Sequence, residues 1–185
     1  GDVMRTLLRL SLAGTVILVL LGGLGGAVAA QDDEMPGTHV TGVVSGPLWP
    51  GPWPAPTEEG RATYWSDWRV ERPVEWSDPR LPSMMTTVLS ISEHRIPADI
   101  VQTWAATHRL DGPDGAWTGT ERGVNNLSTE PGGRVGLLVL TGEGAYEGWT
   151  AVLATLTEPW GEFYEGFILE GHPPAMPDPV EPPAE

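Results

Sequence analysis

The feature that most constrains the fold is a series of short β-prone segments, separated by turn signals, that begins near residue 38. We predict eight strands, at residues 38–46, 61–71, 84–92, 100–110, 115–123, 134–141, 147–157 and 163–170. The segments between them are rich in Gly, Pro and Asp, which favour turns. No window of about 11 residues after the N-terminal segment sustains the 3.6-residue period of a helix. The sequence therefore predicts an all-β protein.

Eight short strands with short connections favour a small eight-stranded antiparallel barrel, with a β-sandwich as the alternative. The interior of such a barrel is either filled by side chains or just wide enough for one small ligand. The chain contains no cysteine, so no disulfide framework can stabilise it. At 185 residues the chain is long enough to build a hydrophobic core without one.

The N-terminal segment has the features of a secretory signal. Arg5 and Arg9 precede an apolar run at residues 15–21, and a glycine-rich stretch leads to small residues at 27–30. This order is typical of a signal peptide cleaved after export. A retained membrane anchor is the alternative, because residues 10–30 are uncharged and nearly long enough to span a bilayer. We expect a signal peptide at residues 1–30 and a secreted or cell-envelope protein.

The remaining chain divides into four parts by composition. Residues 31–37 form an acidic linker, and residues 38–172 form the β-barrel domain. A Pro-rich insertion at residues 46–60 interrupts this domain, since prolines do not join a sheet interior. Residues 173–185 are acidic and rich in Pro, which predicts a disordered tail.

The charge of the chain excludes several partners and cofactors. The formal net charge is −15, with 25 acidic and 10 basic residues. Nucleic-acid binding and polybasic membrane binding both need clustered cations, so we expect neither. The four histidines (39, 94, 108 and 172) do not have the spacing of two side chains that bind one metal ion. No phosphate-binding loop or nucleophile motif is present. We therefore predict no metal and no cofactor, and assign no catalytic residue.

Five residues are candidates for ligand binding. Trp65 and Trp104 lie within predicted strands, and aromatic side chains at a barrel mouth can stack on a sugar or a flat apolar ligand. Core packing is the alternative for both. Trp117 and Glu121 share one face of a strand, and Arg122 lies on the other. If the Trp117 face is interior, Glu121 is a buried carboxylate with a raised pKa, a potential acid or base. The simpler interpretation places Trp117 near a barrel end and Glu121 in solvent at the rim.

Residues 140–151 (LTGEGAYEGWTA) resemble the strand–turn–strand signature of the allene oxide cyclase and dirigent barrels. Residues 115–123 (GAWTGTERG) and 167–171 (FILEG) occupy positions that neighbouring strands would have in such a barrel. The chain also resembles exported bacterial proteins without assigned activity, which carry a turn like that of residues 77–80 (SDPR). The resemblance covers residues 112–171 and implies a fold rather than a function, because its motif consists of turn glycines.

Three classes of function agree with these features. We favour an exported non-catalytic barrel that binds a small apolar or carbohydrate-like ligand, or a surface partner. A structural or interaction module of the cell envelope with a filled barrel is the first alternative. An enzyme of the cyclase or isomerase type, acting in a dry pocket, is the second. The oligomeric state and the ligand cannot be derived from the sequence.

Overall fold

The computed structural model describes residues 37–46, 52–97, 99–127, 134–158 and 161–172. These residues form nine β-strands and no helix, which confirms the predicted fold class. The strands are β1 (Gly37–Val44), β2 (Thr57–Glu59), β3 (Ala62–Trp76), β4 (Met84–Ile96), β5 (Asp99–Asp111), β6 (Gly115–Asn126), β7 (Arg134–Gly144), β8 (Trp149–Glu158) and β9 (Gly161–Glu170). The expected signal peptide and C-terminal tail lie outside the described residues. Within the described ranges, no helix has the length and hydropathy to cross a membrane.

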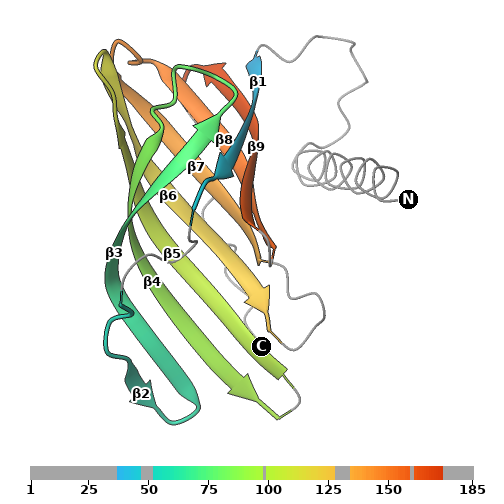
Figure 1. The fold of residues 1–185 in the computed structure, drawn as a ribbon. Coiled ribbons are helices and arrows are strands. Elements are labelled where there is room, and N and C mark those ends of the chain that lie inside the picture. The colour runs from blue at the N-terminus through green and yellow to red at the C-terminus, as the bar shows by residue number, and fades with distance from the viewer. Residues whose placement is uncertain (1–36, 47–51, 98, 128–133, 159–160, 173–185) are drawn as a thin grey trace, which may run out of the picture. The chain divides into compact units, whose positions relative to one another are not determined.

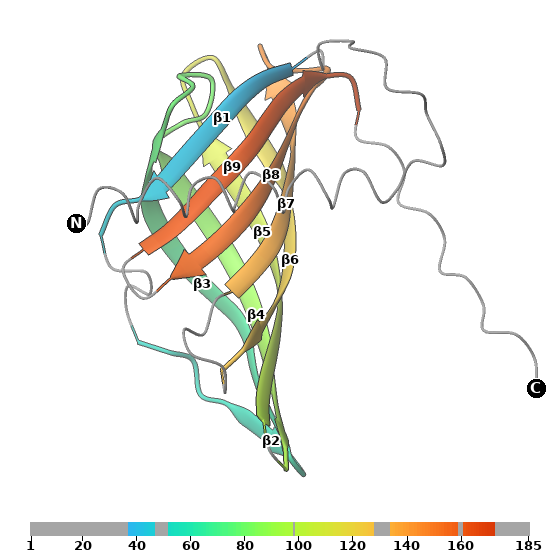
Figure 2. The same cartoon turned by 90° about the vertical axis from the view of Figure 1, so that its right-hand side faces the viewer.

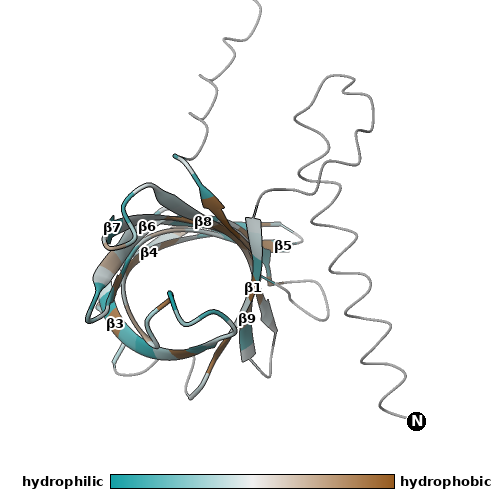
Figure 3. Cartoon of the chain, turned by 90° about the horizontal axis from the view of Figure 1, so that it is seen from above, coloured by the Kyte–Doolittle hydropathy of each residue, from teal (hydrophilic) through white to brown (hydrophobic). Residues whose placement is uncertain are grey.

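Eight of these strands form a closed antiparallel ring (Figures 1 and 3). From β3 to β9, each strand pairs with the next one along the chain. β1 closes the ring, because it pairs with β9 on one side and with β3 on the other. The arrangement is the predicted eight-stranded barrel and not a sandwich. The short strand β2 was not predicted; it lies inside the Pro-rich insertion and pairs with the start of β3.

The ring is unequal in height. β3 has 15 residues and β4 and β5 have 13 each, whereas β1 has 8. The longer strands therefore extend below the ring as a curved sheet, visible at the bottom of Figure 2. The short strand β1 is the neighbour of β3 in the ring and meets it only through residues 42–44 and 74–76. The lower half of the barrel thus differs from the upper half, and the candidate site lies in this lower half.

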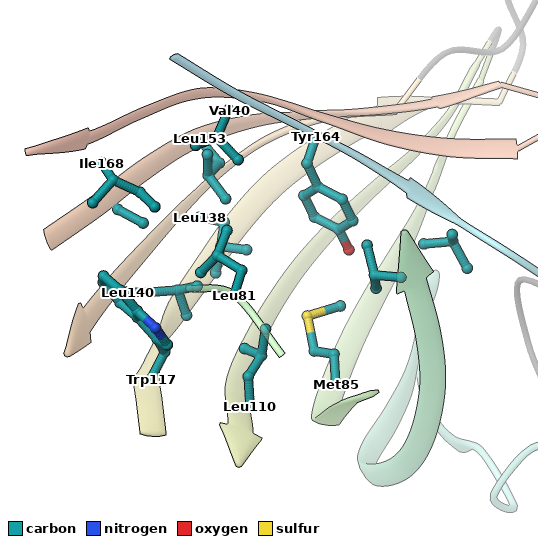
Figure 4. Close-up of a cluster of buried hydrophobic side chains, with 13 residues drawn as sticks. Val40, Leu81, Met85, Leu110, Trp117, Leu138, Leu140, Leu153, Tyr164 and Ile168 are labelled. Carbon is teal, nitrogen blue, oxygen red and sulfur yellow. The ribbon is translucent and has the colours of Figure 1, made fainter. Parts of the chain in front are cut away.

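The upper half of the barrel is a packed apolar core. Its buried side chains come from every strand of the ring and are shown in Figure 4: Val40, Val44, Val74, Leu81, Met85, Leu110, Trp117, Leu138, Leu140, Ala151, Leu153, Tyr164 and Ile168. Leu81 belongs to the β3–β4 connection, which closes this end. The indole nitrogen of Trp117 donates a hydrogen bond of 2.8 Å to the carbonyl of Arg80 in the same connection. No large ligand can enter an interior packed in this way.

Candidate functional site

A belt of polar side chains faces inward where the lower half of the barrel begins. Strand register places these residues directly opposite one another around six consecutive strands, from β4 to β9: Glu93, Gln102, Asn125, Arg134, Thr157 and Glu162. We call this set the polar belt. All six face the interior, because on each strand they are an even number of residues away from buried side chains, and alternate residues of a strand share one face.

Neighbouring members of the polar belt are hydrogen-bonded to one another. The side-chain amide of Gln102 donates to Glu93 over 3.0 Å, and the guanidinium of Arg134 donates to Gln102 over 3.4 Å. The side-chain oxygen of Asn125 is buried and accepts no hydrogen bond within the described residues. A buried polar atom of this kind indicates a place where water or a ligand would bind.

A buried ion pair connects the belt residue Glu162 on β9 to β3, a strand with which β9 forms no backbone pairing. Arg72 on β3 donates to Glu162 on β9 over 2.8 Å, and both side chains are almost fully buried. The Arg72 guanidinium also donates to the Tyr164 hydroxyl over 3.3 Å, and that hydroxyl donates to Glu162. Burial raises the pKa of Tyr164 well above its ordinary value, and the charges of Glu162 and Glu121 add to this shift despite the opposing effect of Arg72. Tyr164 is therefore a neutral hydrogen-bond donor at neutral pH.

A second buried chain of polar groups runs from β4 to β6. The hydroxyl of Thr87 lies 3.0 Å from Nδ1 of His108, and Nε2 of His108 lies 3.0 Å from Oε2 of Glu121. Burial alone would raise the pKa of the Glu121 carboxyl, but the interactions with His108, Thr155 and Arg72 lower it below its usual value. Glu121 is thus an ionised carboxylate inside the barrel.

This placement agrees with the interpretation of Glu121 as a buried carboxylate and corrects the direction of its pKa shift. The residue is 4% exposed, so the expectation of a solvated carboxylate at the rim was wrong. The pKa is lowered rather than raised, because the strand register places His108 and Arg72 close enough to outweigh burial.

Tryptophan side chains form the other wall of this region. An added Cβ at Gly123 would lie 2.1 Å from the Trp104 ring, and one at Gly136 would lie 3.0 Å from it. Trp104 therefore lies against the backbone of β6 and β7, where these two glycines leave room. Trp65 and Trp68 on β3 pack with Leu89, Ile91 and Ala106 in a second apolar cluster. Trp53, from the segment before β2, covers this cluster, with its ring 4.3 Å from that of Trp68 and 5.7 Å from that of Trp65.

A small cavity lies between the tryptophan wall and the charged groups. Its apolar side consists of Leu89, Ile91, Trp104 and Ala106, and its polar side consists of Arg72, Thr87, Gln102, Glu121, Arg134, Thr157 and Glu162. Its volume of about 20 Å³ holds a single water molecule. Two guanidinium groups and two carboxylates line it, so their formal charges balance.

Arg134 occupies space that a ligand could use. Its guanidinium lies over the Trp104 ring, 5.9 Å from the ring centroid. Burial lowers the pKa of Arg134, and the carboxylates of Glu162 and Glu121 offset this only in part. The charge is thus poorly stabilised inside the barrel compared with water. An arginine side chain can place its charged end in water while its apolar stem stays against the protein.

The structure brings together some of the five predicted site residues and separates the others. Trp104 and Glu121 line the same cavity, and Trp65 packs in the adjoining apolar cluster. Trp117 lies at the closed upper end, fully buried and stacked on Tyr146 with 5.5 Å between ring centroids. Arg122 is exposed on the outer surface of β6 and does not reach the interior.

Sequence reasoning missed the polar residues that complete this site, although a signal for them is present. Arg72 is in phase with the inward-facing Trp68, Val70 and Val74 on β3. His108, Arg134 and Glu162 likewise fall at positions where alternation places the interior. A charged residue in the apolar phase of a strand is therefore the signal that could have identified them.

In the part of the chain that the structure describes, no three His, Asp or Glu side chains are grouped as a metal ion would require. The chain matches no family model, no curated protein and no solved structure.

Proposed function

We propose that this protein is a non-catalytic barrel that binds a small, neutral ligand between the tryptophan wall and the polar belt. The observation that carries the proposal is the position of the buried charges beside an apolar aromatic wall. Buried charges cost free energy that an apolar filling would not, and such groups are concentrated at functional sites. A barrel that only needed a filled interior could have continued the apolar packing of its upper half.

The chemistry of the walls suggests the class of ligand. Trp104 offers an aromatic face, and Gln102, Asn125 and Arg134 offer planar hydrogen-bonding groups near it. Since the charges lining the cavity balance, a ligand without net charge suits it best. A carbohydrate-like molecule, or an apolar molecule with a polar head, has this combination of surfaces. The cavity is smaller than such a ligand, so binding would displace Arg134 from the Trp104 ring.

The test is native mass spectrometry of the full chain purified from its source, before and after mild denaturation. We expect an extra mass that is lost on unfolding. The variant Trp104→Ala should lack this mass. The control Trp149→Ala should keep it, because Trp149 packs against Arg80 at the upper end, 4.9 Å from its guanidinium. Equal retention of the mass by both variants would contradict the proposed location.

A structural module with a filled barrel is the second candidate, and the small cavity volume favours it. In this case the protein would show a bare mass and no heat of binding with neutral disaccharides or long-chain alcohols. A cyclase- or isomerase-type enzyme is the third candidate, with Glu121 as the base. It predicts that Glu121→Gln binds ligand normally but converts none of it.

Export and family likeness are also part of the proposal. Residues 1–30 would direct the chain to the cell envelope or the exterior. The resemblance to the allene oxide cyclase and dirigent barrels is supported by the observation that residues 112–171 contain four consecutive barrel strands, β6 to β9.

A further inference from the structure

Among the described residues, outward-facing apolar side chains are most concentrated on one side of the barrel. On β6 to β9, three adjacent rows of outward-facing residues follow from the strand register. The rows are Val124, Val135, Leu156 and Phe163; Arg122, Leu137, Ala154 and Glu165; and Thr120, Val139, Val152 and Phe167. We call these twelve residues the lateral face. Three of its apolar side chains are about half exposed: Val124 at 51%, Val135 at 46% and Leu137 at 49%.

The opposite side of the barrel is more polar, and its large exposed apolar side chains, Met84 and Ile96, lie at the two ends of β4. Outward residues there include Arg69, Glu71 and Glu75 on β3 and Thr103, Thr107 and Arg109 on β5. A lipid-facing barrel would carry an apolar band around its whole circumference, so the one-sided pattern does not fit a lipid environment. An exposed apolar area on one side of a barrel is typical of an interface with another protein.

The two charged residues of the lateral face indicate which protein. Arg122 and Glu165 lie in the same row, and Leu137 and Ala154 separate them. They are therefore placed symmetrically about a line that runs along the strands between β7 and β8. A two-fold axis on this line would set Arg122 of one copy opposite Glu165 of the other, twice in each dimer. The same operation would set Val124 opposite Phe163 and Val135 opposite Leu156.

We propose that the lateral face binds a second copy of this chain, as a two-fold dimer with two Arg122–Glu165 pairs beside an apolar centre. Two chains that each carry a net charge of −15 generally repel one another. The lateral face is neutral, however, because its only charged residues are one arginine and one glutamate, both in the middle row. Strand spacing and rise give a footprint of roughly 20 by 20 Å, or about 400 Å² per copy. This is smaller than the interface of a stable dimer, so the dimer is weak and dissociates on dilution.

A charge-swap series on the full chain tests the proposal by sedimentation velocity over a wide range of protein concentration. We expect a concentration-dependent dimer for the natural sequence. Arg122→Glu and Glu165→Arg should each raise the dissociation constant by about tenfold or more, because each variant sets like charges opposite one another twice. The double variant with both changes should restore the dimer, since opposite charges face one another again.

The matched control is Arg69→Glu, which makes the same charge change on the polar side. Its side chain is 69% exposed, and the variant should dimerise like the natural sequence. Circular dichroism of every variant checks that the barrel is folded. A protein that is monomeric at all concentrations would overturn the proposal. Dimers that both single variants leave unchanged, or that the double variant fails to restore, would also overturn it.

Discussion

The buried pair of Arg72 and Glu162 allows a quantitative test of how the interior is stabilised. Their side chains are 3% and 5% exposed, with 2.8 Å between the nitrogen and the oxygen. The variant Glu162→Gln keeps the shape of the side chain and removes its charge. A buried charge left without its partner costs about 3–5 kcal/mol. Because Glu121 also interacts electrostatically with Arg72, we expect a loss near the lower limit, about 3 kcal/mol.

This loss is large compared with the stability of a typical domain, about 5–15 kcal/mol. Urea denaturation followed by circular dichroism measures it. With a slope of about 2 kcal/mol per molar urea, the midpoint should fall by about 1.5 M. The control Glu71→Gln removes one member of an exposed pair, in which Arg69 and Glu71 lie 3.9 Å apart. Its midpoint should stay unchanged, because exposed ion pairs contribute little.

A double variant separates charge compensation from packing. Arg72→Met with Glu162→Leu replaces both charges by apolar side chains, which is often neutral or stabilising for a buried pair. We expect this variant to regain most of the stability that Glu162→Gln loses. Our explanation of the pair would be refuted by a Glu162→Gln midpoint equal to that of the natural sequence. A double variant as unstable as the single one would refute it too.

Three further predictions concern the same interior. Because the pKa of Glu121 is lowered in the folded state, its ionisation stabilises the fold above the ordinary carboxyl pKa, and this contribution is lost as pH falls through the folded-state pKa. In Glu121→Gln, the free energy of unfolding should therefore fall less steeply as the pH is lowered. Because the pKa of Tyr164 is raised in the folded state, above about pH 10 this hydroxyl ionises in the unfolded chain but not in the folded one. The free energy of unfolding therefore falls above this pH, and it should fall less in Tyr164→Phe. Gly123→Ala places a Cβ against Trp104 and should cost about 1–3 kcal/mol in urea denaturation; the same substitution in a Trp104→Ala background should cost almost nothing.

The strands were predictable because each carries its own alternation and ends at a local turn signal. All eight barrel strands were located, but the end of β3 and the short strand β2 were missed. The prediction ended β3 at residue 71, whereas the strand continues through Pro73 to Trp76. The proline is tolerated because it lies just past Val44↔Val74, the last pair of the β1–β3 ladder, where its missing N–H removes no ladder bond. Its carbonyl still accepts the Ser45 N–H over 3.0 Å. β2 was missed because three residues among prolines carry too little pattern.

The candidate site was less predictable, because it depends on strand register. Alternation shows that Trp117 and Glu121 share a face, but it does not show which groups the neighbouring strands place beside Glu121. His108 and Arg72 reach it from β5 and β3, so the sign of its pKa shift follows from the closed barrel and not from its own strand. The same holds for Trp104, whose orientation depends on glycines in two other strands.

The division of the barrel into two halves links these observations. The connection between β3 and β4 closes the upper end with Leu81, and Trp117 fills the space beneath it. The lower half holds the second apolar cluster, which Trp53 covers, together with the charged residues. Paired charges and hydrogen-bonded amides tolerate both water and a ligand, whereas a purely apolar filling would exclude both. The polar belt therefore lies between the packed core and the proposed binding site, and ligand binding should depend on Trp104 and the belt while leaving the upper half unchanged.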